Sequence, residues 1–302
     1  MKKIWNYRIT YIIIGWLLIL AAIAADTSIS VLDYEIVTDK VEKPVRIVLI
    51  TDFHSSSYGK DQQLLADVIK AQEPDVLLFA GDIAENIRPH KHTQELLSAV
   101  SGDHPCFYVT GNHEEWSGEV EKIKDIVRSC GVKVLEGESV LFDANGQEIR
   151  ISGVENSMPG TQFEDCCAEA GDEIFTVFMS HRPDHADMYS GKGFDLVVCG
   201  HAHGGQALIP GFGTKERYIK DSGVTLLSTH GKGKRMAFLN GLYAPDQGLF
   251  PKYAGGEYLL ADGSTEMIVS RGLCKNILPR VFDQPEVVII DVVPENYTQI
   301  TA

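Results

Sequence analysis

The chain has 302 residues, of which 44% are hydrophobic and 23% are charged, and this composition is ordinary for a globular protein that buries a full core. Its formal net charge of −15 at pH 7 argues against nucleic acid or an anionic lipid surface as the main electrostatic partner, because both are polyanions. Bound metal ions would offset part of this charge, although a soluble acidic surface explains it equally well.

The first 26 residues differ from the rest of the chain. Residues 9–25 carry no charge and follow the cations Lys2, Lys3 and Arg8. A helix over this stretch would span about 25 Å, the short end of what crosses a bilayer. The sequence therefore predicts a single-pass anchor over residues 1–26 in the cell membrane, with an extracytoplasmic domain over residues 27–302. The alternative is a secreted protein, because Ala22-Ile23-Ala24 offers a cleavage pattern for a signal peptide.

Apolar runs and amphipathic stretches alternate in the first half of the chain. They predict strands over 29–37, 45–51, 75–80 and 106–110, and helices over 61–71, 93–100 and 120–129. The second half is richer in strands, with one helix over 161–170 and a hairpin turn at Asn145-Gly146. Its predicted strands cover 133–135, 140–143, 148–153, 175–179, 196–199, 267–270 and 287–293. We expect a single α/β domain, an α+β sandwich of two packed mixed β-sheets flanked by helices, which is a monomer.

Metal-ligand side chains follow the apolar runs, each just past the end of a predicted strand. They are Asp52, His54, Asp82, Asn112, His113, His181, His201 and His203. Ligands of open α/β sheets bind at the carboxyl ends of the strands, so these side chains are expected to meet. Mixed imidazole and carboxylate donors suit Mn²⁺, Zn²⁺ or Fe more than Mg²⁺ or Ca²⁺. Eight candidates are too many for one tetrahedral ion and suit two ions that share a carboxylate.

Five short blocks, in order along the chain, resemble the signature of the calcineurin-like metallophosphoesterases. The blocks are Asp52-x-His54, Gly81-Asp82, Gly111-Asn112-His113-Glu114, His181, and Gly200-His201-Ala202-His203. The later stretch Gly241-Leu242-Tyr243-Ala244-Pro245 is similar to the bacterial membrane-anchored, YkuE/YaeI-like branch of that family. The resemblance covers about residues 45–210 by motif.

The resemblance implies a role for each residue. One divalent ion would be bound by Asp52, His54 and His203, the other by Asn112, His181 and His201, and Asp82 would bridge the two. A hydroxide shared by the ions would attack phosphorus. His113 would face the phosphoryl group and stabilise developing charge or protonate the leaving oxygen, so Asp82 and His113 are the predicted catalytic residues. Glu114 would form local hydrogen bonds or simply begin a helix.

The implied activity is hydrolysis of phosphoric esters. We expect a phosphodiesterase or pyrophosphatase acting on an envelope or lipid-linked substrate, and no nucleic acid partner. One alternative is pyrophosphate hydrolysis of the UDP-2,3-diacylglucosamine type. An alternative of another class is a non-catalytic metal-binding scaffold, against which the complete set of predicted ligands argues.

Two features depart from the family pattern. Glu85 stands where the family often has Asp, so a hydrogen bond behind the metal ligands is expected to differ. A basic insert of about 27 residues, over 214–240, follows the last block. The insert would be a lid that contacts an anionic substrate or a solvated surface loop, and the sequence favours the loop.

Overall fold

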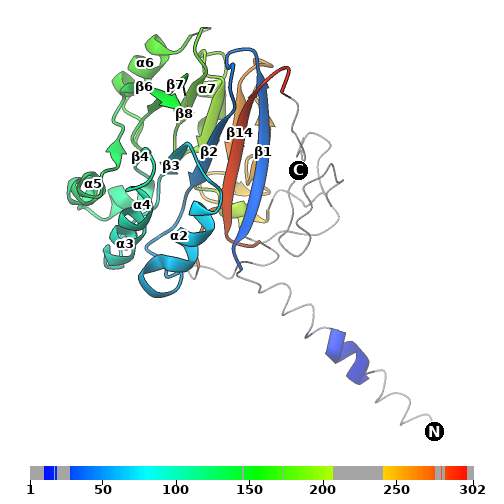
Figure 1. Cartoon of the computed structure of the whole chain (residues 1–302). Helices are drawn as coiled ribbons and strands as arrows, with labels where there is room; N and C mark the ends of the chain where they lie inside the picture. The colour runs from blue at the N-terminus through cyan, green and yellow to red at the C-terminus, as the bar shows by residue number, and fades with distance from the viewer. Residues whose placement is uncertain are drawn as a thin grey trace.

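The computed structural model describes residues 10–16, 18, 28–144, 146–171, 173–206, 241–275, 280 and 283–297. The predicted insert over residues 214–240 lies outside these described residues, as does most of the predicted anchor. Figure 1 shows the arrangement of the described elements along the chain.

The first sheet has six strands in the order β1-β14-β2-β3-β4-β5. Strands β2 to β5 run parallel, whereas β14 runs antiparallel to β2 and carries β1 parallel to itself on the outer edge. The strands are β1 (Ser30–Thr38), β2 (Val45–Ile50), β3 (Val76–Ala80), β4 (Cys106–Val109), β5 (Lys133–Val134) and β14 (Glu286–Pro294). Every residue of β3 is buried, as expected for a central strand covered on both faces.

The second sheet also has six strands, in the order β12-β13-β9-β8-β7-β6. Strands β13, β9, β8 and β7 are parallel, and the two outer strands are antiparallel to their neighbours. The strands are β6 (Ser139–Ala144), β7 (Gln147–Gly153), β8 (Thr176–Met179), β9 (Leu196–Cys199), β12 (Gly256–Leu259) and β13 (Glu266–Val269). A separate two-stranded hairpin consists of β10 (Tyr243–Ala244) and β11 (Gly248–Leu249).

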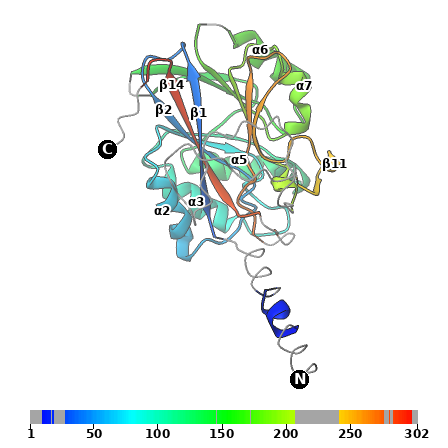
Figure 2. The ribbon, with the colours of Figure 1, turned by 90° about the vertical axis from the view of Figure 1, so that its right-hand side faces the viewer.

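The two sheets pack face to face, with helices on their outer faces. One core joins the inner faces of both sheets, for example Ile47 and Leu78 with Val177 and Val198. The outer face of the first sheet packs against α2 (Gln63–Lys70), α3 (Lys91–Val100) and α5 (Val120–Ser129). The outer face of the second packs against α6 (Gly160–Glu169) and α7 (Ala186–Tyr189). Figure 2 shows α2 and α3 on one side of the sheets and α6 and α7 on the other.

The predicted sandwich of two mixed sheets flanked by helices is confirmed. Several short elements were not predicted from the sequence. They are α4 (Asn112–Trp116), β10, β11, β12 and the short 3₁₀ turns η1 (Lys60–Gln62), η2 (Pro183–His185) and η3 (His203–Gly205). Each is too short to display a hydrophobic period.

Among the described residues, no helix is long and apolar enough to cross a membrane. Residues 10–16 are helical. The anchor over residues 1–26 therefore stays a prediction.

None of the six cysteines forms a disulfide. Cys106 and Cys199 are buried and pack as small core residues.

Candidate metal centre

Five of the predicted ligands have a left-handed backbone. The φ angles are 49° at Asp52, 49° at His54, 53° at Asp82, 67° at His201 and 47° at His203. Such angles are uncommon outside glycine and gather at functional sites, where the surrounding structure must hold them. Here the loops after β2 and β3 hold each other, because the backbone N–H of Asp52 donates to Gly81 O at 3.0 Å and that of His54 to Asp82 O at 2.9 Å.

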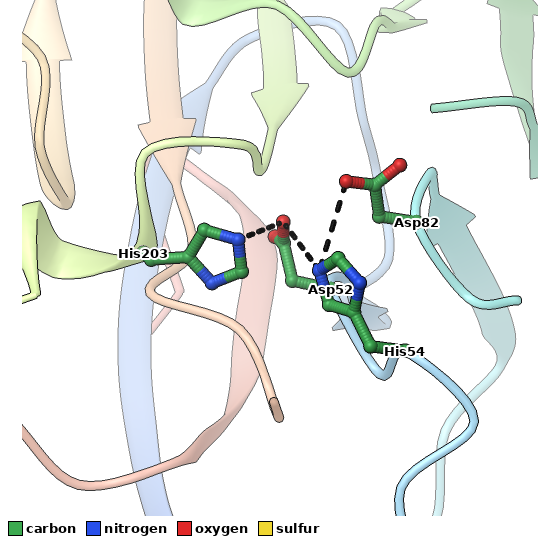
Figure 3. A group of neighbouring side chains, drawn as sticks. All are labelled: Asp52, His54, Asp82 and His203. Atoms are coloured by element: carbon green, nitrogen blue, oxygen red, sulfur yellow. Dashed lines mark ion pairs between the residues drawn. The ribbon is translucent and has the colours of Figure 1, made fainter. Parts of the chain in front are cut away.

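Asp52, His54, Asp82 and His203 form the first group of donors, with ligand atoms all within 4.8 Å of one another. His54 Nε2 lies 3.9 Å from Asp52 Oδ1 and 3.6 Å from Asp82 Oδ2, and His203 Nε2 lies 3.4 Å from Asp52 Oδ1. Figure 3 shows the two imidazoles on either side of Asp52, with Asp82 beyond His54. The side chains come from the carboxyl ends of β2, β3 and β9.

Asp82, His181 and His201 form the second group, again within 4.8 Å of one another. His181 Nε2 lies 3.2 Å from Asp82 Oδ2. Asn112 begins α4 beside Asp82, since the next backbone N–H, that of His113, donates to Asp82 Oδ1 at 2.8 Å. Asp82 belongs to both groups, and the aspartates and histidines divide between the groups as the family resemblance implied for the two ions. The binding of ions by these residues and by Asn112 stays a prediction.

Orphaned polar atoms test whether these residues fit metal ions. In the described part of the chain, His54 Nε2, His181 Nε2 and Asn112 Oδ1 are buried and make no hydrogen bond of good geometry, although His181 Nε2 lies in ion-pair contact with Asp82. A buried polar atom without a partner is costly and needs an explanation, such as an ion. The three atoms belong to predicted ligands of both ions. The donors therefore suit a binuclear centre for divalent ions, and their mixture of imidazole and oxygen is the one expected for Mn²⁺, Zn²⁺ or Fe.

The electrostatics of the site favour positive charge between the two aspartates. Burial raises the pKa of Asp52, and the charge of Asp82 acts in the same direction. Burial also acts to raise the pKa of Asp82, but His181 and His54 outweigh it and hold that pKa well below its ordinary value. Burial acts to lower the pKa of His181, yet the charges of Asp82 and Asp52 raise it to about 10. A divalent ion would replace this proton when it binds.

Two glycines leave room for the aspartates. A side chain at Gly111 would place its Cβ 2.2 Å from Asp82 Oδ1, and one at Gly200 would place it 2.3 Å from Asp52 Oδ2. Both distances are far below contact distance, so only glycine fits at these positions.

Glu114 joins the loops that carry the bridging aspartate and Asn112. Its carboxylate accepts the backbone N–H groups of Asp82 at 2.9 Å, Ala84 at 2.8 Å and Gly111 at 2.8 Å. The last of these bonds caps the start of α4. Burial, followed by the charge of Asp82, raises the pKa of Glu114 to about 7. Glu114 thus lies in the first turn of a helix and also fixes the loops around the donor groups through its hydrogen bonds. The two roles considered from the sequence, local hydrogen bonds and the start of a helix, both apply.

His113 lies beside the first group with part of its ring exposed. Its Nδ1 is 2.9 Å from Glu85 Oε1 and 3.2 Å from Asn86 Oδ1, and its ring centroid is 4.5 Å from that of His54. Burial acts to lower the pKa of His113, but the bond to Glu85 and the charge of Asp82 outweigh it, so the pKa is raised. With Nδ1 occupied, Nε2 remains to donate to a substrate.

Glu85 contacts two histidines at once. One carboxylate oxygen lies 3.0 Å from His54 Nδ1, and the other lies 2.9 Å from His113 Nδ1. Burial acts to raise the pKa of Glu85, but the bonds to His113 and His54 lower it, so the group stays ionised. Glu85 stands where the sequence predicted a changed hydrogen bond behind the metal ligands, and these two contacts are the ones it makes there. The longer side chain couples a predicted ligand to a predicted catalytic histidine.

Replacing Glu85 by Gln should lower kcat by about 10- to 100-fold, as loss of a group that orients metal ligands does. A neutral amide has one accepting oxygen, so it cannot accept from both rings. Steady-state kinetics on a soluble phosphodiester would measure the effect. The neighbouring substitution Asn86→Ala is the control and should cost less, because Glu85 still holds His113. Equal effects of the two substitutions would show that Glu85 has no special role.

Asp246 orients His201 from a distant part of the chain. His201 Nε2 lies 2.9 Å from Asp246 Oδ2. Asp246 lies in the turn between β10 and β11 and also contacts Arg182, with Nη2 at 3.0 Å. Arg182 is paired with Asp184 as well, at 2.9 and 2.8 Å. No local pattern in the sequence indicated Asp246, because 45 positions separate it from His201.

Substituting Asp246 by Ala should weaken the binding of one of the two ions by roughly 10- to 100-fold. The ring of His201 would lose the partner that fixes its orientation. Calorimetric titration of the metal-free chain with Mn²⁺ would resolve the two binding steps. Asp187→Ala, an exposed aspartate in α7, is the matched control and should leave both steps unchanged. Unchanged binding in the Asp246 variant would contradict the orienting role.

A double-sheet sandwich with two aspartate–histidine groups that share one carboxylate defines a binuclear metallohydrolase. The model of the family described as Calcineurin-like phosphoesterase matches residues 45–205, more than half of the chain. The chain belongs to this family. It is accordingly a hydrolase that acts on phosphoester bonds, with a site for two divalent ions.

Three curated relatives show how far the similarity extends. The uncharacterized metallophosphoesterase YkuE of Bacillus subtilis is 26% identical over 252 residues, which are 81% of this chain and 77% of the relative. The uncharacterized protein YpbG of the same organism is 29% identical over 180 residues, 59% of this chain and 68% of the relative. The phosphodiesterase YaeI of Escherichia coli is 25% identical over 185 residues, 59% of this chain and 67% of the relative.

Proposed function

We propose that this hydrolase is a phosphodiesterase or pyrophosphatase whose substrate is an envelope component or is linked to a lipid. The observation that carries the proposal is the shared carboxylate of Asp82 between two donor groups, with the ring of His113 beside them. The similarity to YaeI, a phosphodiesterase by name, supports the choice of a diester.

Each residue has a defined task in this reaction. Two bound divalent ions supply an activated water and neutralise charge on the phosphoryl oxygens. Asp52, His54 and His203 would hold one ion, and Asn112, His181 and His201 the other. Asp82, which belongs to both donor groups, holds the two groups of ligands next to each other. His113 then donates a hydrogen bond, or its Nε2 proton, to the leaving oxygen, while Glu85 keeps the ring protonated and oriented.

The lipid-linked part of the proposal rests on residues 9–25, which carry no charge. A membrane anchor there would keep the domain in the cell membrane, on the extracytoplasmic side, and would bring it close to lipid-linked substrates. Hydrolysis of the UDP-2,3-diacylglucosamine type is the specific alternative within the class. A secreted form after cleavage of residues 1–26 would act on soluble esters instead.

Three substrates test the proposal. The full-length chain is purified in detergent micelles, and its kcat/KM is measured on a nucleotide-linked lipid pyrophosphate and on the soluble diester bis-p-nitrophenyl phosphate. Each value is compared with kcat/KM on the monoester p-nitrophenyl phosphate. The proposal predicts a kcat/KM on the diester or the pyrophosphate at least tenfold above that on the monoester, a difference of about 1.4 kcal/mol in transition-state binding. A monoester that reacts fastest would overturn it. Metal binding without turnover of any of these substrates would support the alternative of a non-catalytic metal-binding scaffold.

A further inference from the structure

The amino end of β1 lies at the same edge of the first sheet as the metal centre. β1 pairs with β14 from Ser30 opposite Glu286. β14 in turn pairs antiparallel with β2, with Val288 opposite Leu49. Continuing this register by two residues places Glu286, and with it Ser30, level with Thr51. Thr51 directly precedes the first predicted metal ligand.

The chain is fixed where β1 begins. The backbone N–H of Ser30 donates to Pro285 O at 2.8 Å, and its hydroxyl donates to the same oxygen at 3.1 Å. Two strand spacings, or about 10 Å, separate this point from β2. The five residues from 26 to 30 span at most ~18 Å when fully extended. If the uncharged stretch that ends at Ala25 lies in a membrane, that membrane is therefore close to the edge of the sheet that carries the metal centre.

Large apolar side chains are exposed at this same edge. Ile87, in the connection after β3, is 81% exposed, and Trp116, at the end of α4, is 65% exposed. Leu64, in the first turn of α2, is 60% exposed. The ring of Trp116 lies 5.0 Å from that of His113. Figures 1 and 2 both show α2 and the start of β1 toward the same, lower end of the domain.

We propose that this edge of the domain rests on a lipid bilayer, with Ile87 and Trp116 at the level of the headgroups. The inference rests on the proposed anchor and on the phosphoesterase function. Exposed indole and aliphatic side chains suit the membrane interface. Because the chain carries a net charge of −15, contact comes from apolar insertion and not from attraction to anionic lipids. A phosphoester in the headgroup layer would then reach His113 without leaving the bilayer surface.

Quenching of Trp116 fluorescence tests this orientation. The chain has three tryptophans, so Trp5→Phe with Trp16→Phe leaves Trp116 as the only one. The full-length variant is reconstituted into zwitterionic phosphatidylcholine vesicles, with or without bromine on the acyl chains next to the headgroup. We expect the bromolipid to reduce Trp116 emission to about half, as for an indole at the interface.

A tryptophan at the opposite edge is the control. His104 precedes β4 at its amino end, away from the metal centre. His104→Trp with Trp116→Phe in the same background should keep its full emission in the bromolipid. Equal quenching of both variants, or no quenching of Trp116, would overturn the proposed orientation. The second of these results would instead point to a soluble partner or substrate at Trp116.

Hydrolysis of bis-p-nitrophenyl phosphate by the same variants, purified in detergent and not reconstituted into vesicles, checks the function separately. Metal-dependent hydrolysis without quenching would retain the phosphoesterase and reject the membrane-facing orientation. Quenching without hydrolysis would retain the orientation and reject the proposed activity. Hydrolysis also shows that each tryptophan variant is folded.

Discussion

Replacing Asp82 by Asn should lower kcat/KM for a phosphodiester by a factor on the order of 10³, since charge stabilisation by the ions supplies several kcal/mol. Asp82 is the one described carboxylate that belongs to both donor groups. An amide in its place has a single accepting oxygen and no charge, so it cannot hold both ions. The variant should also lose the increase in melting temperature that metal gives to the unmodified chain.

Steady-state kinetics and thermal unfolding, each with and without Mn²⁺, would check both effects. Asp67→Asn, an exposed aspartate on α2, is the control for the loss of one negative charge and should behave like the unmodified chain. An Asp82→Asn variant that keeps a tenth or more of the activity would contradict the bridging role.

His113→Ala should lower kcat by about 10²- to 10⁴-fold on esters with a poor leaving group, the range for loss of general acid catalysis. The raised pKa of His113 keeps a proton available for the leaving oxygen. A p-nitrophenolate leaving group needs little protonation, so its ester should lose much less. Metal binding should stay intact, because His113 contacts Asp82 through its backbone N–H.

The ratio of kcat between an alkyl and a p-nitrophenyl diester, measured for both chains, isolates this role. Alanine in place of His92, a half-exposed histidine of α3, provides the matched control. An equal loss on both esters would assign His113 to charge stabilisation and not to protonation. Weakened metal binding would assign it to the metal centre.

The sequence predicted the central strands and the metal centre for one physical reason. Each predicted ligand follows an apolar run, and parallel strands bring their carboxyl ends to one edge of the sheet. Asp52, Asp82 and His181 could therefore be placed together before the fold was known. The division into two ligand sets that share Asp82 came from the family resemblance, and Asp82 lies in both donor groups of the structure.

Other features depend on contacts that no local pattern records. Asp246 reaches His201 only because the turn after β10 folds back onto the loop after β9, where Leu242 N–H donates to Gly205 O at 2.9 Å. The double contact of Glu85 likewise depends on the direction of two rings from different loops. Such long-range contacts are set by tertiary packing, which hydrophobic periodicity does not encode.

Metal titration coupled to hydrolysis is the most direct test of the binuclear centre. The full-length chain is stripped with chelator, and Mn²⁺ or Zn²⁺ is added stepwise while bound ions per chain and turnover of bis-p-nitrophenyl phosphate are measured together. We predict no turnover in the stripped chain and full turnover only when two ions are bound. Turnover that persists in chelator, or a chain that holds two ions and hydrolyses no phosphoester, would contradict the account.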